Sequence, residues 1–311
     1  MAQNHVYMAP SRRLGRSLGV DLVPHKTCSF DCIYCQLGRT TRLTMTPQPG
    51  PSVEELVRQV SEALTRGPRP DYLTLSGSGE PTLYQPLGEL ITALARVFRP
   101  LAVLTNGSLL ASPAVRSALL GADVVLPSLD APDEATFQCV NRPHRDLSLT
   151  RLVDGLRLFR KEFRGAIWLE VMLLGGVTAT RAQGEALARL TTLLEPDRIH
   201  LNTVVRPPAE PFTLAATDED LRCLRELFGR HAEVIAQPVV SKGEEAKVVA
   251  EGAILDVLMR RPCTVGDLSA ALGVASSPLV KVLASLLDRG TVQVQVRQRR
   301  VFYSVGRGGV Q

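Results

Sequence analysis

The 311-residue sequence has no long apolar run and no signal-like N-terminus. No stretch approaches the ~20 consecutive apolar residues that a membrane-spanning helix needs. The opening residues, MAQNHVYMAP, have neither the basic region nor the apolar core of a secretory signal. We therefore expect a cytoplasmic protein without a membrane partner.

Cysteine is scarce, and half of the cysteines have no neighbour at ligand spacing. Of the six cysteines, Cys139, Cys223 and Cys263 are scattered singly. A disulfide framework needs paired cysteines in an oxidising compartment, and a structural zinc site usually takes a second ligand pair from further along the chain. The sequence therefore gives little support to either kind of site.

A strong excess of one charge is also missing, although the charge is uneven. The net charge is +5, and from residue 251 onward eight Lys or Arg stand against four Asp or Glu. Such asymmetry is compatible with a polyanionic partner without identifying one. With 45% hydrophobic and 22% charged residues, the chain has a globular composition. Its length predicts one large domain and one small one.

What the sequence does contain is three cysteines in one short loop, CSFDCIYC. Cys28, Cys32 and Cys35 have C-x3-C-x2-C spacing, which brings three thiolates to one metal centre. A 4Fe-4S cluster is normally held by four thiolates, so three leave one iron free to bind a small molecule. Zinc is the alternative, with His25 just upstream as a further ligand.

Short runs rich in Val, Ile and Leu alternate with amphipathic stretches, which is typical of strand and helix units in a parallel sheet. Behind Ser52, apolar residues recur at helical spacing, and Glu55 completes a capping box. Consecutive units of this kind fit either an open doubly wound sheet or a partial barrel, with the site at the carboxyl ends of the strands. We expect six strands, at residues 18–23, 72–76, 101–105, 123–127, 167–173 and 198–204.

Two motifs follow the second and third of these strands. In SGSGEPTL, Gly77 and Gly79 would let the backbone approach a ligand, and Glu80 would offer a carboxylate to an ammonium group. In TNG, Asn106 would hydrogen-bond a ribose or a carboxylate. By themselves, a glycine-rich segment and an Asn-Gly pair are also ordinary turn signals.

The fourth strand is followed by PSLD. Ser128 and Asp130 are two residues apart, so they share one side of an extended segment and suit two hydroxyl or amine contacts. As the alternative, both are common helix caps. Further candidates for substrate or cofactor contact lie in loops near the expected strand ends: Arg142, His144, Arg145, Asn202 and Arg206.

The C-terminal part predicts three helices and a hairpin. Residues 245–260, the segment TVGDLSAAL and the segment SSPLVKVLASLLDRG have helical patterns, and TVQVQV and RVFYSV alternate as two strands. This order resembles a winged helix, with Arg297, Arg299 and Arg300 at the tip of the hairpin. We place the two domains at 1–240 and 241–311.

The third of these helices has few residues suited to reading DNA. Its exposed face offers little beyond Lys281, whereas a base-reading helix needs several long polar side chains. We therefore favour docking or substrate recognition over sequence-specific DNA binding.

The cysteine loop, with Tyr34 directly before the third cysteine, resembles the signature of the radical S-adenosylmethionine (SAM) superfamily. The stretch SRRLGRSLGVDLVPHKTCSFDCIYCQLGRTT is similar to the wyosine-synthase-like iron-sulfur oxidoreductases, and further motifs continue to about residue 205. The resemblance implies a partial (β/α)6 TIM-type barrel, one 4Fe-4S cluster, bound SAM and an electron donor such as flavodoxin or ferredoxin.

The resemblance also implies site residues and a reaction. In the superfamily a G-G-E-like motif binds the amino group of SAM; here Ser78 stands at the second glycine and Glu80 is retained. The implied reaction is reductive cleavage of SAM to methionine and a 5'-deoxyadenosyl radical, which abstracts hydrogen from an unidentified substrate. The implied SAM-binding residues are Tyr34, Gly77, Ser78, Gly79, Glu80, Asn106, Ser128 and Asp130.

Three substrate classes and one non-catalytic function remain open. The wyosine-like resemblance suggests a guanine of transfer RNA, but authentic wyosine synthases bind a second cluster through cysteines near the N-terminus, and none precedes Cys28. A protein or a small metabolite would be modified instead. The non-catalytic alternative, an iron-sulfur or zinc regulator that binds DNA through its C-terminal part, has no need of the SAM-type motifs.

Overall fold

The computed structural model describes residues 4–235, 250–297 and 300–306. Its centre is an eight-stranded sheet with the order β1-β2-β5-β6-β7-β8-β9-β10. Only β1 runs antiparallel to its neighbour, and every other adjacent pair is parallel. The strands are β1 (Val6–Ser11), β2 (Gly15–Val20), β5 (Tyr72–Leu75), β6 (Leu101–Thr105), β7 (Val124–Pro127), β8 (Ala166–Met172), β9 (Arg198–Asn202) and β10 (Ala232–Val234).

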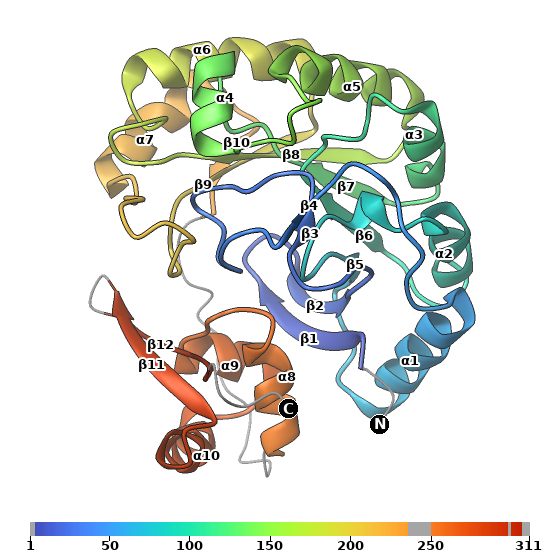
Figure 1. The fold of residues 1–311 in the computed structure, drawn as a ribbon, viewed down its shortest axis with the longest axis vertical. Coiled ribbons are helices and arrows are strands. Elements are labelled where there is room, and N and C mark those ends of the chain that lie inside the picture. Colours follow the sequence, from blue (N-terminus) through green and yellow to red (C-terminus); the bar gives the residue numbers. More distant parts are fainter. Residues whose placement is uncertain (1–3, 236–249, 298–299, 307–311) are drawn as a thin grey trace.

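The six strands expected from the sequence correspond to β2, β5, β6, β7, β8 and β9, and β1 and β10 extend the sheet at its two edges. Helices follow the strands along the chain and lie in an arc on the outer side of the curved sheet (Figure 1). These helices are α1 (Val53–Arg66), α2 (Leu87–Leu94), α3 (Pro113–Leu119), α4 (Glu134–Val140), α5 (Leu149–Glu162), α6 (Arg181–Leu194) and α7 (Asp218–Leu227). Short elements are β3 (Thr27–Cys28), β4 (Arg42–Leu43) and the 3₁₀ helix η1 (Pro81–Leu83).

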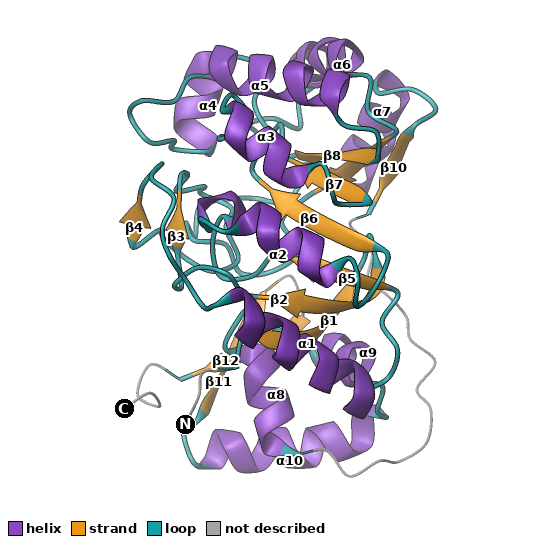
Figure 2. Ribbon diagram, turned by 90° about the vertical axis from the view of Figure 1, so that its right-hand side faces the viewer, coloured by secondary structure: helices purple, strands orange, loops and turns teal. Residues whose placement is uncertain are grey.

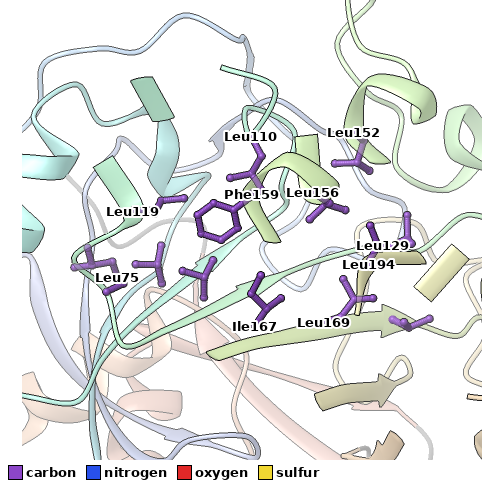
Figure 3. Close-up of a cluster of buried hydrophobic side chains, with 14 of the residues drawn as sticks. Leu75, Leu110, Leu119, Leu129, Leu152, Leu156, Phe159, Ile167, Leu169 and Leu194 are labelled. Atoms are coloured by element: carbon purple, nitrogen blue, oxygen red, sulfur yellow. The ribbon is translucent and has the colours of Figure 1, made fainter. Parts of the chain in front are cut away.

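Alternation along the strands produces two apolar layers. On β8, Ile167 and Leu169 belong to the large core beneath the helices, while Trp168 belongs to a smaller cluster on the inner face. Phe159 of α5 packs onto the same outer layer (Figure 3). Burying each such side chain contributes about 1.5–3 kcal/mol, so the helices stabilise the outer face of the sheet.

One capping prediction was partly wrong. Ser52 caps α1 by accepting a hydrogen bond from the backbone N of Glu55 at 3.2 Å. The Glu55 carboxylate, however, accepts hydrogen bonds from Arg58 and Gln59 on the helix surface. The reciprocal half of the capping box is therefore replaced by these side-chain contacts.

The C-terminal residues form a second unit with a core of its own. It contains α8 (Glu251–Leu258), α9 (Val265–Leu272), α10 (Ser276–Asp288), β11 (Val292–Arg297) and β12 (Arg300–Val305). Both views show this unit beside β1, and helices α8 and α9 contact that strand (Figures 1 and 2). The domain boundary expected at residue 240, the first residues of the expected helix 245–260 and Arg299 lie outside the described residues.

The described part of the chain contains no helix that is both long and apolar enough to span a membrane.

Candidate functional site

The cysteine loop follows β2 and lies at the carboxyl ends of the parallel strands. It is tied down by backbone hydrogen bonds to the end of α4 and the segment after it. The bonds join Asp31 N to Asn141 O at 3.0 Å, Ile33 N to Val140 O at 3.0 Å and His144 N to Ser29 O at 2.9 Å. The three cysteines are therefore held on a braced loop rather than on a free one.

Each thiol has a hydrogen-bond donor from another part of the site. These donors reach Cys35 from Lys26 Nζ at 3.1 Å, Cys28 from Asn106 Nδ2 at 3.5 Å and Cys32 from Asn141 Nδ2 at 3.6 Å. Donors aimed at sulfur stabilise its anionic form, which is the form that binds metal. The donor set therefore fits a group bound through thiolates.

The burial and the neighbouring carboxylates, by contrast, oppose the bare thiolates. Burial, and then the Glu80 carboxylate, raises the pKa of Cys28 to about 12. Burial, and then Asp130, raises the pKa of Cys32 well above its ordinary value. Thiols in such a place become thiolates when a cation binds them, so the loop suits a cationic metal group.

The grouping of possible metal ligands separates a single zinc ion from an iron-sulfur cluster. Among the residues that the structure describes, no three His, Cys, Asp or Glu side chains are grouped so as to hold a single metal ion. In an iron-sulfur cluster the cysteines bind different irons and lie further apart than the ligands of one ion.

The glycines after β5 pack against the protein itself. A Cβ on Gly77 would lie 1.6 Å from Oδ1 of Asp21, and one on Gly79 would lie 2.1 Å from the carbonyl oxygen of Thr27. Gly77 also has a φ of +127°, which strongly favours glycine. Backbone hydrogen bonds from Lys26 to Ser78 O, at 2.6 Å, and from Glu80 to Thr27 O, at 3.0 Å, join the two loops. The glycines thus bring residues 77–80 directly against the cysteine loop.

The Glu80 side chain is buried and fully engaged by its neighbours. Its Oε1 accepts hydrogen bonds from Thr82 N, Thr82 Oγ1 and Thr105 Oγ1, and its Oε2 accepts one from Asn106 N at 2.7 Å. Asn106 in turn donates to Ser29 Oγ at 2.8 Å. The contact of Glu80 with an ammonium group remains a prediction, and the structure gives this carboxylate a second task, which is to fix Asn106 beside Cys28.

Asp130 is the corresponding buried carboxylate on the other side of the loop. It accepts hydrogen bonds from the Tyr34 hydroxyl, from Asn141 Nδ2 at 2.9 Å and from Met172 N at 2.9 Å. Burial raises the pKa of Asp130, and these donors act against that rise. Asp130 therefore positions both Tyr34, which is part of the cysteine loop, and Asn141, which donates to Cys32.

A cavity of about 230 Å³ opens beside this group, on the inner face of the sheet. Its wall brings together several residues predicted from the sequence, far apart in the chain. These are Tyr34, Cys35, Ser128, Asp130, Asn202 and Arg206. This shared cavity is the strongest reason to treat them as one site.

Other predicted residues lie elsewhere. Arg142 has a φ of +43° and pairs with Glu210 at 2.5 Å. His144 contacts Asp146 at 3.5 Å, and Arg145 is 89% exposed. Arg142, His144 and Arg145 are absent from the cavity wall, although the backbone of Arg142 and His144 bonds to the cysteine loop.

The cavity wall also contains residues that we did not predict. Arg12 and Arg13 come from the turn between β1 and β2, and Arg13 pairs with Glu170 of β8. Glu170 stands within IWLEVML, where a charged residue in an otherwise apolar strand is the one available signal in the sequence. No comparable feature of the sequence marked the two arginines, because their position in the cavity wall depends on the pairing of β1 with β2.

Comparison with protein families gives one broad match. The profile of the Radical SAM superfamily matches residues 22–184. UPF0026 protein MJ1312 of Methanocaldococcus jannaschii is 38% identical over 228 residues, which cover 71% of this chain and 71% of that protein. A protein of Brachyspira hyodysenteriae named GTPase Obg is 36% identical over 300 residues, which cover 95% of this chain and 44% of that protein. The chain thus spans less than half the length of the Brachyspira protein.

Solved structures show the same fold at low sequence identity. A radical SAM methyltransferase from Sphaerobacter thermophilus superposes with a TM-score of 0.57 at 21% identity, covering 71% of this chain and 66% of that one. TYW1 with a lysine-pyruvate adduct superposes with a TM-score of 0.51 at 18% identity, covering 68% of this chain and 72% of that one. At these identities the likeness concerns the fold alone.

Proposed function

Because the chain belongs to the radical SAM superfamily and to the UPF0026 family, we propose that it cleaves SAM reductively at a 4Fe-4S cluster and modifies a further substrate. Cys28, Cys32 and Cys35 are the proposed cluster ligands. When bound, the reduced cluster supplies the electron that breaks a carbon-sulfur bond of SAM, giving methionine and a 5'-deoxyadenosyl radical.

The protein's own residues orient the reactants. Lys26, Asn106 and Asn141 donate hydrogen bonds to the three sulfurs and hold them in place. Ser128 and Asp130 line the cavity beside Tyr34 and are the proposed polar contacts of SAM.

The observation that carries this proposal is the meeting of the cysteine loop and the cavity. Cys35 and Tyr34 belong to both, and Asp130 joins them through its bond to the Tyr34 hydroxyl. A cofactor held by the cysteine loop would therefore have a preformed cavity beside it that could take a substrate.

Release of 5'-deoxyadenosine tests the proposal. Protein reconstituted anaerobically with iron and sulfide, then given SAM and dithionite, should release 5'-deoxyadenosine, detected by liquid chromatography. Cys32→Ala should abolish this release. Cys223→Ala is the matched control, because Cys223 is an exposed free cysteine on α7. Equal release by wild type and Cys32→Ala would refute the assigned ligands.

Members of the superfamily need an electron donor, and we propose a flavodoxin or ferredoxin for this one. The wyosine-like branch is a narrower proposal, supported by the sequence motifs and compatible with the fold shared with TYW1. Transfer RNA nucleosides from a deletion strain, compared with wild type, test it directly. An unchanged nucleoside profile would exclude the transfer RNA substrate.

The C-terminal unit is the proposed site of substrate docking. Its order of three helices and a hairpin supports the winged-helix assignment, and it packs beside the sheet edge at β1. GTP hydrolysis is not proposed for this chain, because its sequence has no G-x4-G-K-[S/T] phosphate-binding loop. The non-catalytic regulator is disfavoured by membership of an enzyme superfamily.

A further inference from the structure

Two cavities share a wall made by arginines. The first, described above, extends from Cys35 to Arg12 and Arg206. The second, of about 350 Å³, lies between the inner side of the sheet and the C-terminal unit, and its wall also contains Arg12 and Arg206. On the side of the C-terminal unit this wall includes Asp267 and Arg300. A molecule beside the cysteine loop would therefore reach arginines at its other end.

Arg12 is presented by the tight turn between β1 and β2. Ser11 Oγ accepts a hydrogen bond from Leu14 N at 3.1 Å, and Gly15 completes the turn with a φ of +64°. The Nη1 atom of Arg12 is buried, and no group among the described residues accepts a hydrogen bond from it. The turn thus holds a guanidinium inside the protein with a donor to spare.

The carboxylates nearby already have partners. Glu170 pairs with Arg13, and Asp267 pairs with Nη2 of Arg206 at 3.2 Å. Arg206 is itself buried, with 9% of its side chain exposed, and its Nε atom has no acceptor within the described part of the chain. Each of the two arginines that line the shared wall therefore has one buried donor without an acceptor among the described residues.

The positive charge of Arg12 is also poorly balanced by the groups around it. Burial, and then Arg206 and Arg13, lowers the pKa of Arg12 to about 9. Burying a cation without a partner is costly, and a bound anion removes that cost. Guanidinium groups match the oxygens of phosphate and carboxylate in two-pronged hydrogen bonds.

We propose that Arg12 and Arg206 bind a phosphate or carboxylate group of a small-molecule substrate. This inference rests on the proposed function, because the same cavity continues to Cys35 and Tyr34, where the reaction would occur. The anionic group anchors one end of the substrate, and the end that loses hydrogen lies toward the cysteine loop. SAM also carries a carboxylate, so the test has to separate the two sources.

Inorganic phosphate and succinate serve as probes, each titrated into the full-length protein and followed by calorimetry and by the melting temperature. At least one should bind, and Arg12→Gln should weaken that binding at least tenfold. Arg12→Lys keeps the charge without the two-pronged geometry and should bind with intermediate strength. Arg181→Gln is the matched control, because Arg181 is 84% exposed and pairs only with Glu185 among the described residues.

A purely structural arginine would behave differently. Without a probe anion, Arg12→Gln should melt at the same temperature as wild type or higher, because it removes an unbalanced buried charge. A lower melting temperature together with unaltered probe affinity would overturn the proposal, as would an absence of binding of both probes to wild type.

Two further measurements separate a substrate anion from the SAM carboxylate, and this inference from the proposed function. Reconstituted Arg12→Gln should bind SAM within twofold of wild type; a loss of SAM affinity as large as the loss of probe affinity would reassign the site to the SAM carboxylate and overturn the proposal. Release of 5'-deoxyadenosine without probe binding would refute this inference alone. Probe binding without that release would refute the proposed function and keep the anion site.

Discussion

At the scale of single residues, the pKa of His200 is set more by its burial than by the carboxylate beside it. It lies on β9 with 1% of its side chain exposed, and its ring packs edge-on against Trp168 at 5.4 Å between ring centres. Its Nε2 lies 2.9 Å from a carboxylate oxygen of Glu233, which favours the charged form. Burial nevertheless lowers the pKa of His200 to about 4, so the folded protein keeps this side chain neutral near neutral pH.

This burial predicts acid sensitivity in a defined range. Below pH ~6.5 the unfolded chain binds a proton on this histidine that the folded chain does not, until the pH reaches about 4. Stability should therefore fall with decreasing pH in that window, by at most about 1.4 kcal/mol per pH unit from this residue. Urea unfolding from pH 7 to 4 should show a shallower loss in His200→Leu than in wild type.

A control separates the effect of His200 on stability from that of the other groups that bind protons as the pH falls. His231→Gln replaces an exposed histidine on the loop before β10 and should keep the wild-type slope. Identical pH dependence of wild type and His200→Leu would contradict the assignment.

Single residues also show what the sequence can and cannot predict about the site. The places of the three cysteines and Asp130 beyond strand ends could be predicted because they stand within short motifs, and their roles stay predictions. Arg12 could not, because its place in the cavity wall depends on a turn that brings it to the same wall as Arg206, nearly two hundred residues away in the chain. Arg142 and His144 were predicted from loop position alone; they do not line the cavity, and their contact with substrate or SAM stays a prediction.

At the scale of elements, the site depends on two loops packed backbone to backbone. The loop after β5 and the cysteine loop exchange hydrogen bonds between Lys26 and Ser78 and between Thr27 and Glu80. Such close contact is available only where no Cβ intervenes, which explains the glycine at position 79. The geometry of the cysteines is therefore set by a neighbour outside their own loop.

Gly79→Ala should disturb this contact. Its Cβ would lie 2.1 Å from Thr27 O, so the loops have to separate, at a cost of about 1–3 kcal/mol. Lower stability to urea and fewer irons retained per chain after anaerobic reconstitution are the expected results. Gly252→Ala is the matched control: it is exposed in α8 with no atom within 4 Å of its added Cβ, and should stabilise the helix by up to about 1 kcal/mol. Normal iron retention in Gly79→Ala would disprove the argument.

Among the elements, the six parallel strands could be predicted because each is a short apolar run between turn signals. The edge strands were missed for physical reasons. β1 contains Pro10 and is held by antiparallel pairing with β2, a contact distant from its own sequence pattern. β10 has three residues and depends on pairing with β9, so it lacks the length that a periodic pattern needs.

At the scale of the whole molecule, one carboxylate connects the two units. Asp21, just after β2, accepts a hydrogen bond from Ser78 N through Oδ1 at 2.7 Å and one from Arg260 Nε through Oδ2 at 2.8 Å. Arg260 belongs to the C-terminal unit, donates to Asn4 O at 3.0 Å and lies over the Tyr7 ring at 4.0 Å. The C-terminal unit is therefore anchored to the residue that shapes the loop after β5.

Arg260→Ala should loosen both the unit and the loop. Removing this partly buried ion pair leaves Asp21 without its cation and should cost about 3 kcal/mol of stability. Equilibrium dialysis on the reconstituted protein should show severalfold weaker SAM binding. Arg289→Ala, which breaks the exposed pair with Glu251 inside the C-terminal unit, should cost less than about 1 kcal/mol and leave SAM affinity unchanged. Unchanged affinity in Arg260→Ala would show that Asp21 shapes the loop without help from the C-terminal unit.

Sharing of Asp21 between the two units has a thermodynamic consequence that works in both directions. Suppose that a large partner docks on the C-terminal helices and strengthens the bond between Arg260 and Asp21, and that this raises the affinity of the loop after β5 for the cofactor by some factor. The bound cofactor must then raise the protein's affinity for that partner by the same factor. Such reciprocal coupling would make the enzyme bind and cleave its cofactor chiefly when the partner is already bound.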